Sequence, residues 1–318
     1  MTSFKWHRAV IKIGSALISP NGSGCSAEYL LPIAKFITAS RQQGKEVIVV
    51  SSGSVAAGRN SIKTGLQASI AEKQAMAAIG QTQMMANWAQ LFDFPCAQIL
   101  LTLDDLHDRR RYVNVKNTLR ELLANHALPI VNENDTVAVD EIKVGDNDNL
   151  AAHTALVAQA DTLIICTDVD GLFNADPRKN PKAELMPCIE VITPEISALA
   201  GGAGSKVGTG GMITKLQAAQ KCAESGVQTL LVSGKHASVF DALLTGKCPG
   251  TLFKASSKQR SARHQWLSHT VKSKGFLSID EGAFIALSQK GASLLAVGIS
   301  EVSGNFKSND AVDVVYNG

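Results

Sequence analysis

Short apolar runs recur through the first 250 residues of the chain. Six of them are rich in Val, Ile and Leu, show no polar alternation and are bounded by turn-forming residues: 9–13 (AVIKI), 46–50, 97–101, 128–132, 162–167 and 229–233. Unbroken apolar content is typical of strands that are buried on both faces. We therefore expect these segments to be strands of one sheet that is covered on both sides.

Helical patterns separate these runs. They span residues 26–43, 69–92, 114–126, 149–160 and 213–225. Ser69 and Glu72 have the spacing of a capping box, and Gly226 follows the last pattern as a helix terminator. Repeated alternation of strand and helix predicts an α/β fold with a doubly wound, mostly parallel sheet.

The character of the sequence changes after residue 254. Residues 254–274 contain six Lys or Arg, several serines and no acidic residue. This predicts a large domain at 1–254, a basic linker at 255–273 and a small β-rich module at 274–318, where glycines punctuate short apolar runs. A basic linker of this kind is more often solvated than bound to RNA.

Composition narrows the class of protein. The chain has 318 residues, of which 45% are hydrophobic and 19% charged, which excludes a disordered or fibrous protein. A net charge of +3 is too weak to indicate a nucleic-acid surface over the whole chain.

Cysteine usage and the N-terminus both indicate a cytoplasmic protein. The six cysteines are scattered, with no CxxC pair and no zinc spacing, so we expect reduced thiols. The apolar stretch after Arg8 imitates a signal peptide, but Lys12 interrupts it and no small-x-small cleavage site follows closely. No apolar run is long enough to cross a bilayer.

Familiar phosphate-binding motifs are missing. The chain has no GxxxxGK[ST] segment and no protein-kinase HRD or DFG triplet. Residues 22–27 formally fit GxGxxA, but they begin nine residues after the first strand rather than in its turn. The candidate chemistry therefore rests on the polar turns that follow the strands.

Lys12 is the first candidate residue. It lies inside an apolar strand, where an unpaired ammonium group is costly. One interpretation is an edge strand from which the lysine reaches solvent; the favoured one is a phosphate partner.

Two small-residue segments are candidate anion sites. Residues 51–54 (SSGS) precede a helix and predict either a cradle of backbone N–H groups or a plain turn with an N-cap. Residues 208–219 (GTGGMITKLQAA) place Lys215 in the first turns of a helix behind three glycines, which indicates either phosphate binding or a surface loop. The coincidence with Lys12 favours phosphate.

Residues 145–149 (GDNDN) allow three interpretations. An EF-hand loop is excluded because Leu150 and Ala151 occupy ligand and turn positions. A helix N-cap needs only one of these side chains. We favour a role in which they bind a polar substrate and orient the two lysines.

Five segments together resemble the glutamate 5-kinases of the amino-acid kinase family: VVSSGSVAAGR, VNENDTVA, IKVGDNDNL, TDVDGLFNADPR and GTGGMITKLQAA. The match runs along residues 8–254 and implies the amino-acid kinase fold. The tail is similar to the start of the PUA domain that many bacterial members carry, and it ends at Gly318, so we expect a partial PUA-like domain. Phe173 stands where many relatives have Tyr.

The resemblance implies an ATP- and Mg²⁺-dependent phosphorylation of the glutamate side-chain carboxylate, the first step of proline biosynthesis. It implies that Lys12 and Lys215 stabilise the transferred phosphoryl group and that Asp148 organises them. It assigns glutamate binding to Ser52, Asp135 and Asn147. The implied nucleotide-binding residues are Lys12, Thr167, Asp168, Thr209, Gly210, Gly211, Met212, Ile213, Thr214 and Lys215.

The chemistry agrees with this assignment. A glutamate carboxylate has a pKa of about 4.3 and is ionised at neutral pH, so no general base is needed. We expect Asp135 to pair with the substrate ammonium group, and Asn147 and Ser52 to donate to its carboxylate. Mg²⁺ is expected to bind through ATP oxygens and water, with no protein metal ligands.

The family suggests a homo-oligomer, a dimer or a tetramer, and a hand-over of the product to glutamyl-phosphate reductase. The alternatives are kinases acting on acetylglutamate, aspartate, carbamate or UMP, whose patterns lack GDNDN with NEND. An RNA-binding or regulatory protein acting through the PUA-like tail is the alternative from another class; RNA binding and membrane attachment are not expected.

Overall fold

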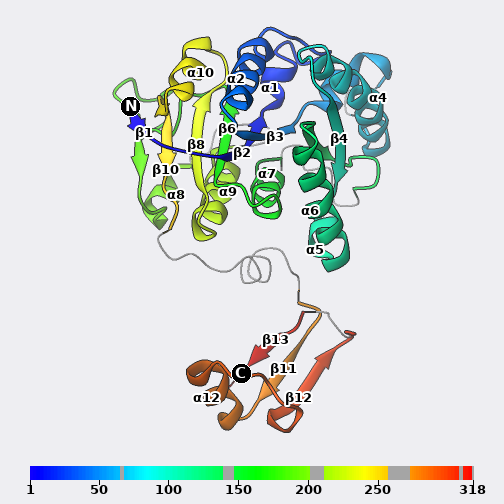
Figure 1. Cartoon of the computed structure of the whole chain (residues 1–318), viewed down its shortest axis with the longest axis vertical. Helices are drawn as coiled ribbons and strands as arrows, with labels where there is room; N and C mark the ends of the chain where they lie inside the picture. The colour runs from blue at the N-terminus through cyan, green and yellow to red at the C-terminus, as the bar shows by residue number, and fades with distance from the viewer. Residues whose placement is uncertain (65–67, 139–146, 201–210, 257–272, 308–310, 317–318) are drawn as a thin grey trace. The chain divides into compact units, whose positions relative to one another are not determined.

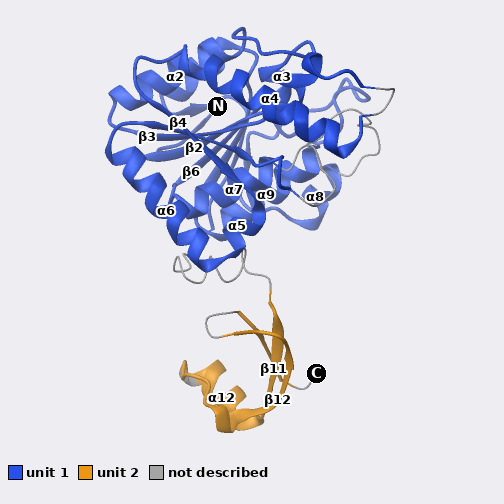
Figure 2. Ribbon diagram, turned by 90° about the vertical axis from the view of Figure 1, so that its right-hand side faces the viewer, with its two compact units in different colours: residues 1–262 blue, residues 263–318 orange. Residues whose placement is uncertain are grey.

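The computed structural model describes residues 1–64, 68–138, 147–200, 211–256, 273–307 and 311–316 (Figure 1). The chain divides into two compact units, residues 1–262 and 263–318 (Figure 2). Most of the expected linker, 255–273, lies outside the described residues.

The first unit is built on a sheet of eight strands in the order β4-β5-β3-β2-β6-β8-β10-β7. The strands are β2 (Arg8–Ile13), β3 (Glu46–Ser51), β4 (Cys96–Leu101), β5 (Leu128–Glu133), β6 (Thr162–Thr167), β7 (Cys188–Ile189), β8 (Gln228–Ser233) and β10 (Thr251–Phe253). All six expected strands are present and pair in parallel; β10 runs antiparallel to β8. The prediction of a mostly parallel sheet is confirmed.

Helices cover both faces of this sheet (Figure 1). One face packs against α1 (Ser15–Ile18), α2 (Leu30–Gln42), α4 (Ile70–Ala89) and α10 (Ala237–Leu244). The other packs against α5 (Leu103–His107), α6 (Arg109–Ala124), α7 (Asn147–Val157), α8 (Pro194–Ala200) and α9 (Met212–Glu224). Smaller elements are α3 (Ser54–Gly58), a 3₁₀ turn (Arg59–Ser61) and the paired strands β1 (Thr2–Ser3) and β9 (Lys247–Cys248).

Side-chain alternation along β2 decides which layer each residue meets. Ala9, Ile11 and Ile13 are fully buried against the α2 layer, whereas Val10 packs in the α7 and α9 layer. Lys12 has the same parity as Val10 and therefore faces α7 and α9. This places one charged side chain inside an otherwise apolar layer.

Local signals at the helix ends are partly confirmed. Ser69 and Glu72 form the expected capping box, with reciprocal bonds of 2.7 and 3.2 Å. Gly226 has a left-handed φ of 78° directly after α9. Helix α7 begins at Asn147, two residues before the expected start, so Asn147, Asp148 and Asn149 lie within the helix.

The second unit combines a three-stranded sheet with a helix. Its elements are β11 (Gly275–Ile279), α12 (Glu281–Lys290), a 3₁₀ turn (Ala296–Gly298), β12 (Ile299–Gly304) and β13 (Asp313–Val315), in the sheet order β12-β11-β13. Helix α12 was not predicted, although its signals are in the sequence: Asp280 accepts a 2.7 Å bond from the Ala283 N–H, and Gly291 ends the helix with φ 60°.

Other expectations concern cysteines and membranes. All six cysteines are free, as expected. No helix among the described residues has both the length and the apolar character that a bilayer span requires.

Candidate active site

The strand order creates a switch point beside β2. The chain passes from β2 to β3 on one side and later returns with β6 on the other. In open α/β sheets ligands bind in the crevice at the carboxyl ends of strands at such a point. Because β2 is a central strand, the interpretation of Lys12 as an edge-strand lysine is wrong.

Asp148 joins the two candidate lysines. Its Oδ1 lies 2.8 Å from Lys12 Nζ and its Oδ2 lies 3.1 Å from Lys215 Nζ. The three residues come from β2, α7 and α9, and their exposed fractions are 5%, 0% and 6%. Lys12 is therefore paired with a carboxylate in this structure, and the phosphate partner that the sequence favoured stays a prediction.

The charge state of this cluster follows from its burial. Burial by itself raises the pKa of Asp148, but the attraction of Lys12 and Lys215 outweighs it, and the pKa lies below its ordinary value. Burial lowers the pKa of Lys215, and the attraction of Asp148 only partly opposes that effect. Within this cluster two ammonium groups stand beside one carboxylate, and in a poorly solvated site such an excess of positive charge favours an anion.

The start of α9 completes the cluster. The Thr214 hydroxyl lies 2.7 Å from Asp148 Oδ2 and 2.8 Å from the Gly211 carbonyl oxygen, and it shares its hydrogen between them. Gly211 is the N-cap residue and no side chain caps the helix, while Met212 and Ile213 form its first turn. Thr209 and Gly210 lie outside the described residues, so the choice between a phosphate-binding and a surface loop stays open.

Thr167 and Asp168 end β6 on the neighbouring side. The Thr167 hydroxyl donates to Asp168 Oδ1 at 3.2 Å. Asp168 is exposed, and its charge is among the smaller influences that raise the pKa of Lys215. The structure thus brings both residues near the lysine cluster.

Asn147 contacts the ends of β3 and β5. Its Nδ2 lies 2.8 Å from Ser52 Oγ, 3.0 Å from Asn132 Oδ1 and 3.3 Å from the Ser51 carbonyl oxygen. Asn147 and Asp148 lie inside the first turn of α7 and point in two directions, one to this polar group and one to the lysines. The N-cap interpretation therefore does not describe these two residues.

Asp135 is held by the same turn. Ser54, which the sequence did not single out on its own, donates from its hydroxyl to Asp135 Oδ2 at 2.8 Å. Burial raises the pKa of Asp135, and the Ser54 hydrogen bond opposes that effect only in part. Ser52 bonds to Asn147 and Ser54 bonds to Asp135, so one short turn contacts both side chains.

The turn at 51–54 depends on Gly53. Gly53 is the N-cap residue of α3 with a left-handed φ of 100°, and a Cβ on it would lie 3.0 Å from Ile18 Cβ. No side chain caps α3, so neither serine plays the N-cap role that one interpretation gave to this turn. Both hydroxyls are instead turned to the polar group at the sheet edge.

Sequence reasoning missed the layer behind these residues. Gln81 of α4 accepts a 2.9 Å hydrogen bond from Asn132 Nδ2. Helix α4 reaches this position because Gly80 crosses α3 closely: a Cβ on Gly80 would lie 1.9 Å from the Ser54 carbonyl oxygen. No motif marks Gln81; only its position next to a helical glycine hinted at a close helix crossing.

The described residues contain no group of three or more His, Cys, Asp or Glu that could hold a metal ion. Asp148, the buried carboxylate of the cluster, is paired with two ammonium groups, which repel a divalent cation.

Solved structures share the fold of the first unit. The chain superposes on "X-ray structures of isopentenyl phosphate kinase" with a TM-score of 0.53 at 19% identity, covering 77% of this chain and 100% of that one. It superposes on the UMP kinase from Bacillus anthracis with a TM-score of 0.54 at 15% identity, covering 78% and 96%. At these identities the likeness concerns the fold alone.

Curated relatives match along nearly the whole chain. The chain is 54% identical to "Glutamate 5-kinase" of Salinibacter ruber over 314 residues, 97% of this chain and 83% of that protein. It is 51% identical to that of Idiomarina loihiensis, covering 98% and 84%, and 48% identical to that of Xanthomonas axonopodis pv. citri, covering 96% and 85%. The PUA domain family matches residues 275–318 and the amino acid kinase family matches residues 7–233. The chain belongs to the amino acid kinase family, and within it to the glutamate 5-kinases.

Proposed function

We propose that this chain transfers the γ-phosphoryl group of ATP to the side-chain carboxylate of L-glutamate and forms glutamyl 5-phosphate, the first step of proline biosynthesis. The observation that carries the proposal is the single buried carboxylate of Asp148, which holds Lys12 and Lys215 at 2.8 and 3.1 Å at the switch point of the sheet.

The reaction brings an anion up to a polyanion. The attacking carboxylate is already ionised, so the enzyme must offset charge repulsion and align the reacting atoms rather than remove a proton. Two lysines that share one carboxylate suit this task, because their ammonium groups are fixed in place before substrates arrive. Asp148 would orient both ammonium groups and keep them from repelling one another.

The nucleotide side is formed by Thr167, Asp168 and residues 209–215. The N–H groups at the start of α9 and Lys215 would hold the phosphates, since a helix N-terminus favours anions. When bound, Mg²⁺ would neutralise phosphate charge through ATP oxygens and water.

The acceptor side is formed by Asp135, Asn147 and Ser52. Asp135 would pair with the ammonium group of glutamate, and that pairing would lower the pKa of the carboxyl, which burial raises. Ser52 accepts the N–H of Asn147 and keeps its own hydroxyl hydrogen for a substrate carboxylate.

Trapping of the product tests the function. With glutamate and MgATP, added hydroxylamine converts an acyl phosphate into a hydroxamate, which we expect to accumulate with equal amounts of ADP. ADP release with acetylglutamate, aspartate, carbamate or UMP, but not with glutamate, would contradict the proposal and name another acceptor. We place the enzyme in the cytoplasm as a homo-oligomer that supplies a glutamyl-phosphate reductase.

A further inference from the structure

Four carboxamide side chains form one hydrogen-bonded line that ends at the acceptor side of the site. We call it the amide line: Gln98 on β4, Gln81 on α4, Asn132 on β5 and Asn147 on α7. Gln81 Nε2 donates to Gln98 Oε1 at 3.1 Å, Asn132 Nδ2 donates to Gln81 Oε1 at 2.9 Å, and Asn147 Nδ2 donates to Asn132 Oδ1 at 3.0 Å. Asn132 and Gln81 are 2% and 7% exposed, so water cannot replace these bonds freely.

A backbone group shows the direction of the line. The Ser51 carbonyl oxygen, 3.3 Å from Asn147, can only accept a hydrogen bond, so the group facing it must be Nδ2. With Nδ2 of Asn147 in that place, Asn132 must present its oxygen to Asn147 and therefore its nitrogen to Gln81. Each amide dictates the orientation of the next.

The direction decides what Asn147 offers to a substrate. Its two N–H hydrogens face three protein acceptors, on Ser51, Ser52 and Asn132, and are not left for a substrate carboxylate. Within the part of the chain that the structure describes, the side-chain hydrogen bonds of Asn147 run through Nδ2. An amide oxygen is an acceptor, which suits an ammonium group. This differs from the expectation that Asn147 donates to the carboxylate of glutamate.

We propose that Gln81 is a positioning residue that acts through Asn132. It holds the oxygen of Asn147 toward the substrate that receives the phosphoryl group, so that the site selects a substrate with an ammonium group. The proposal rests on the proposed function and extends it to substrate selection. Asn147 and the carboxylate of Asp135 both meet the turn at 51–54, and together they offer acceptors to the three N–H donors of one ammonium group.

Removal of the amide of Gln81 should loosen this arrangement. Without Oε1 of Gln81, Asn132 Nδ2 loses its buried acceptor, and with it the hydrogen bond that keeps Asn132 from turning over. A turned Asn132 presents a donor to the donor of Asn147. Asn147 then keeps fewer acceptors for Nδ2, and its oxygen is no longer held toward the substrate.

Kinetics of the Gln81→Met variant of the full chain test the proposal, with Gln83→Met as the control. Methionine is similar in length and has no amide, and Gln83 lies exposed two residues away on the same helix. Glutarate, which has the carbon chain and both carboxylates of glutamate but no ammonium group, is measured as an inhibitor competing with glutamate. One lost hydrogen bond corresponds to a rise of about 2- to 10-fold in the KM for glutamate. We expect kcat within about twofold of wild type by the same reasoning, and the Ki for glutarate unchanged.

The proposal would be overturned if the KM for glutamate and the Ki for glutarate rose by the same factor, or if neither rose. If Gln81→Met does not fold, Gln98→Met on the exposed edge strand provides the second test, with a smaller shift confined to glutamate; equal shifts for the two ligands there would likewise overturn it. Wild-type protein that forms no acyl phosphate from glutamate would refute the proposed function itself. Normal wild-type activity with an unchanged selectivity in Gln81→Met would refute only the role of Gln81.

Discussion

Replacement of Asp148 by asparagine removes the charge that holds the lysine cluster together. Asparagine keeps the shape of the side chain and one acceptor oxygen, but Lys12 and Lys215, both nearly fully buried, lose their common counter-ion. Removing one partner of a buried ion pair costs about 3–5 kcal/mol, because the remaining charge is left uncompensated. At about 2–4 °C per kcal/mol for a domain of this size, the melting temperature should fall by about 6–20 °C.

The contribution of Asp148 to stability should depend on pH. The pKa of Asp148 in the folded protein lies below its ordinary value of about 3.9. Its contribution to the free energy of unfolding is therefore complete above that ordinary value and is lost as the pH falls through the folded-state pKa. The stability difference between wild type and Asp148→Asn should stay constant at neutral pH and close only below about pH 4.

ATP should compensate part of the loss. Phosphates supply the counter-charge that the two lysines lack in Asp148→Asn, so ATP without an acceptor should raise the melting temperature of the variant more than that of wild type. Turnover should nevertheless fall by about 100-fold or more, because the ammonium groups are no longer held in place. The assays are thermal unfolding with and without ATP, and hydroxamate formation.

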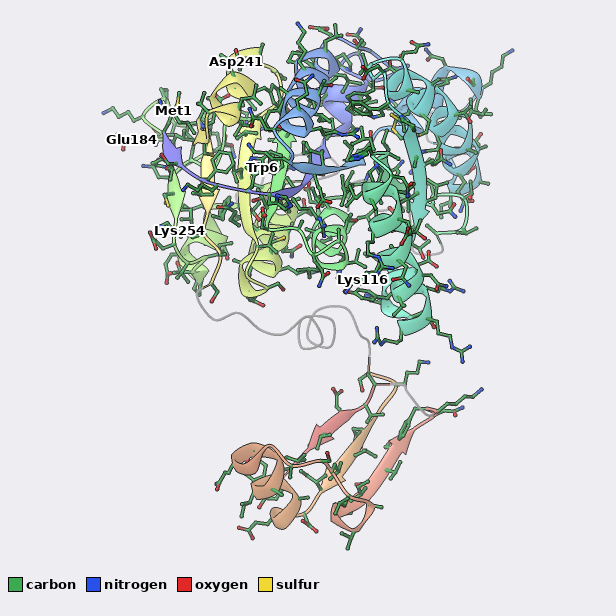
Figure 3. The ribbon with its side chains drawn as sticks, in the orientation of Figure 1. Met1, Trp6, Lys116, Glu184, Asp241 and Lys254 are labelled. Carbon is green, nitrogen blue, oxygen red and sulfur yellow. The ribbon has the colours of Figure 1, made fainter. Side chains whose placement is uncertain are left out.

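The control is Asp241→Asn on α10, where the carboxylate is exposed (Figure 3). Its free energy of unfolding should change by no more than about 0.5 kcal/mol. If Asp148→Asn melted within about 1 °C of wild type, with unchanged turnover, the cluster would not carry the charge balance that we infer from the structure.

Three further outcomes follow from the geometry. Asp135→Asn should raise the KM for glutamate, because the ammonium group loses its partner; an unchanged KM would remove the assignment. The same variant should raise the free energy of unfolding of the ligand-free protein at pH values above the raised pKa of this carboxyl, because a buried charge is removed. Gly80→Ala places a Cβ 1.9 Å from the Ser54 carbonyl oxygen and should lower the free energy of unfolding by about 1–3 kcal/mol in denaturant titrations while raising the KM for glutamate; wild-type values of both would show that α3 and α4 can separate freely. Deletion of residues 255–318 should leave turnover intact, and loss of activity in soluble, folded protein would show that the tail acts on the site.

The sheet could be predicted because its signal is local. The six buried strands are continuous apolar runs, and Ser69 with Glu72 carries a capping signal that needs no tertiary context. Helix α12 shows the limit: Asp280 and Gly291 mark its ends, but its short apolar pattern was taken for strands. The early start of α7 at Asn147 was missed because the polar side chains there are satisfied by tertiary contacts and not by the helix end.

The sequence singles out residues of the candidate site, but it does not show which of them are in contact. Lys12, Asp148 and Lys215 stand out as charged residues in apolar or glycine-rich surroundings, yet only the parity of β2 and the start of α7 show that one carboxylate bridges both lysines. Gln81 carries no such signal, because amide side chains are common on helices. Its role depends on a hydrogen bond with Asn132, which is 51 residues away in the sequence.

A crystal structure of the chain with glutamate, Mg²⁺ and a non-hydrolysable ATP analogue would show where the two ammonium groups lie relative to the phosphates. We expect Lys12 Nζ and Lys215 Nζ both to lie within about 3.5 Å of oxygens of the γ-phosphate, with Asp148 still between them. A γ-phosphate contacted by only one of the two nitrogens, or by neither, would contradict this expectation.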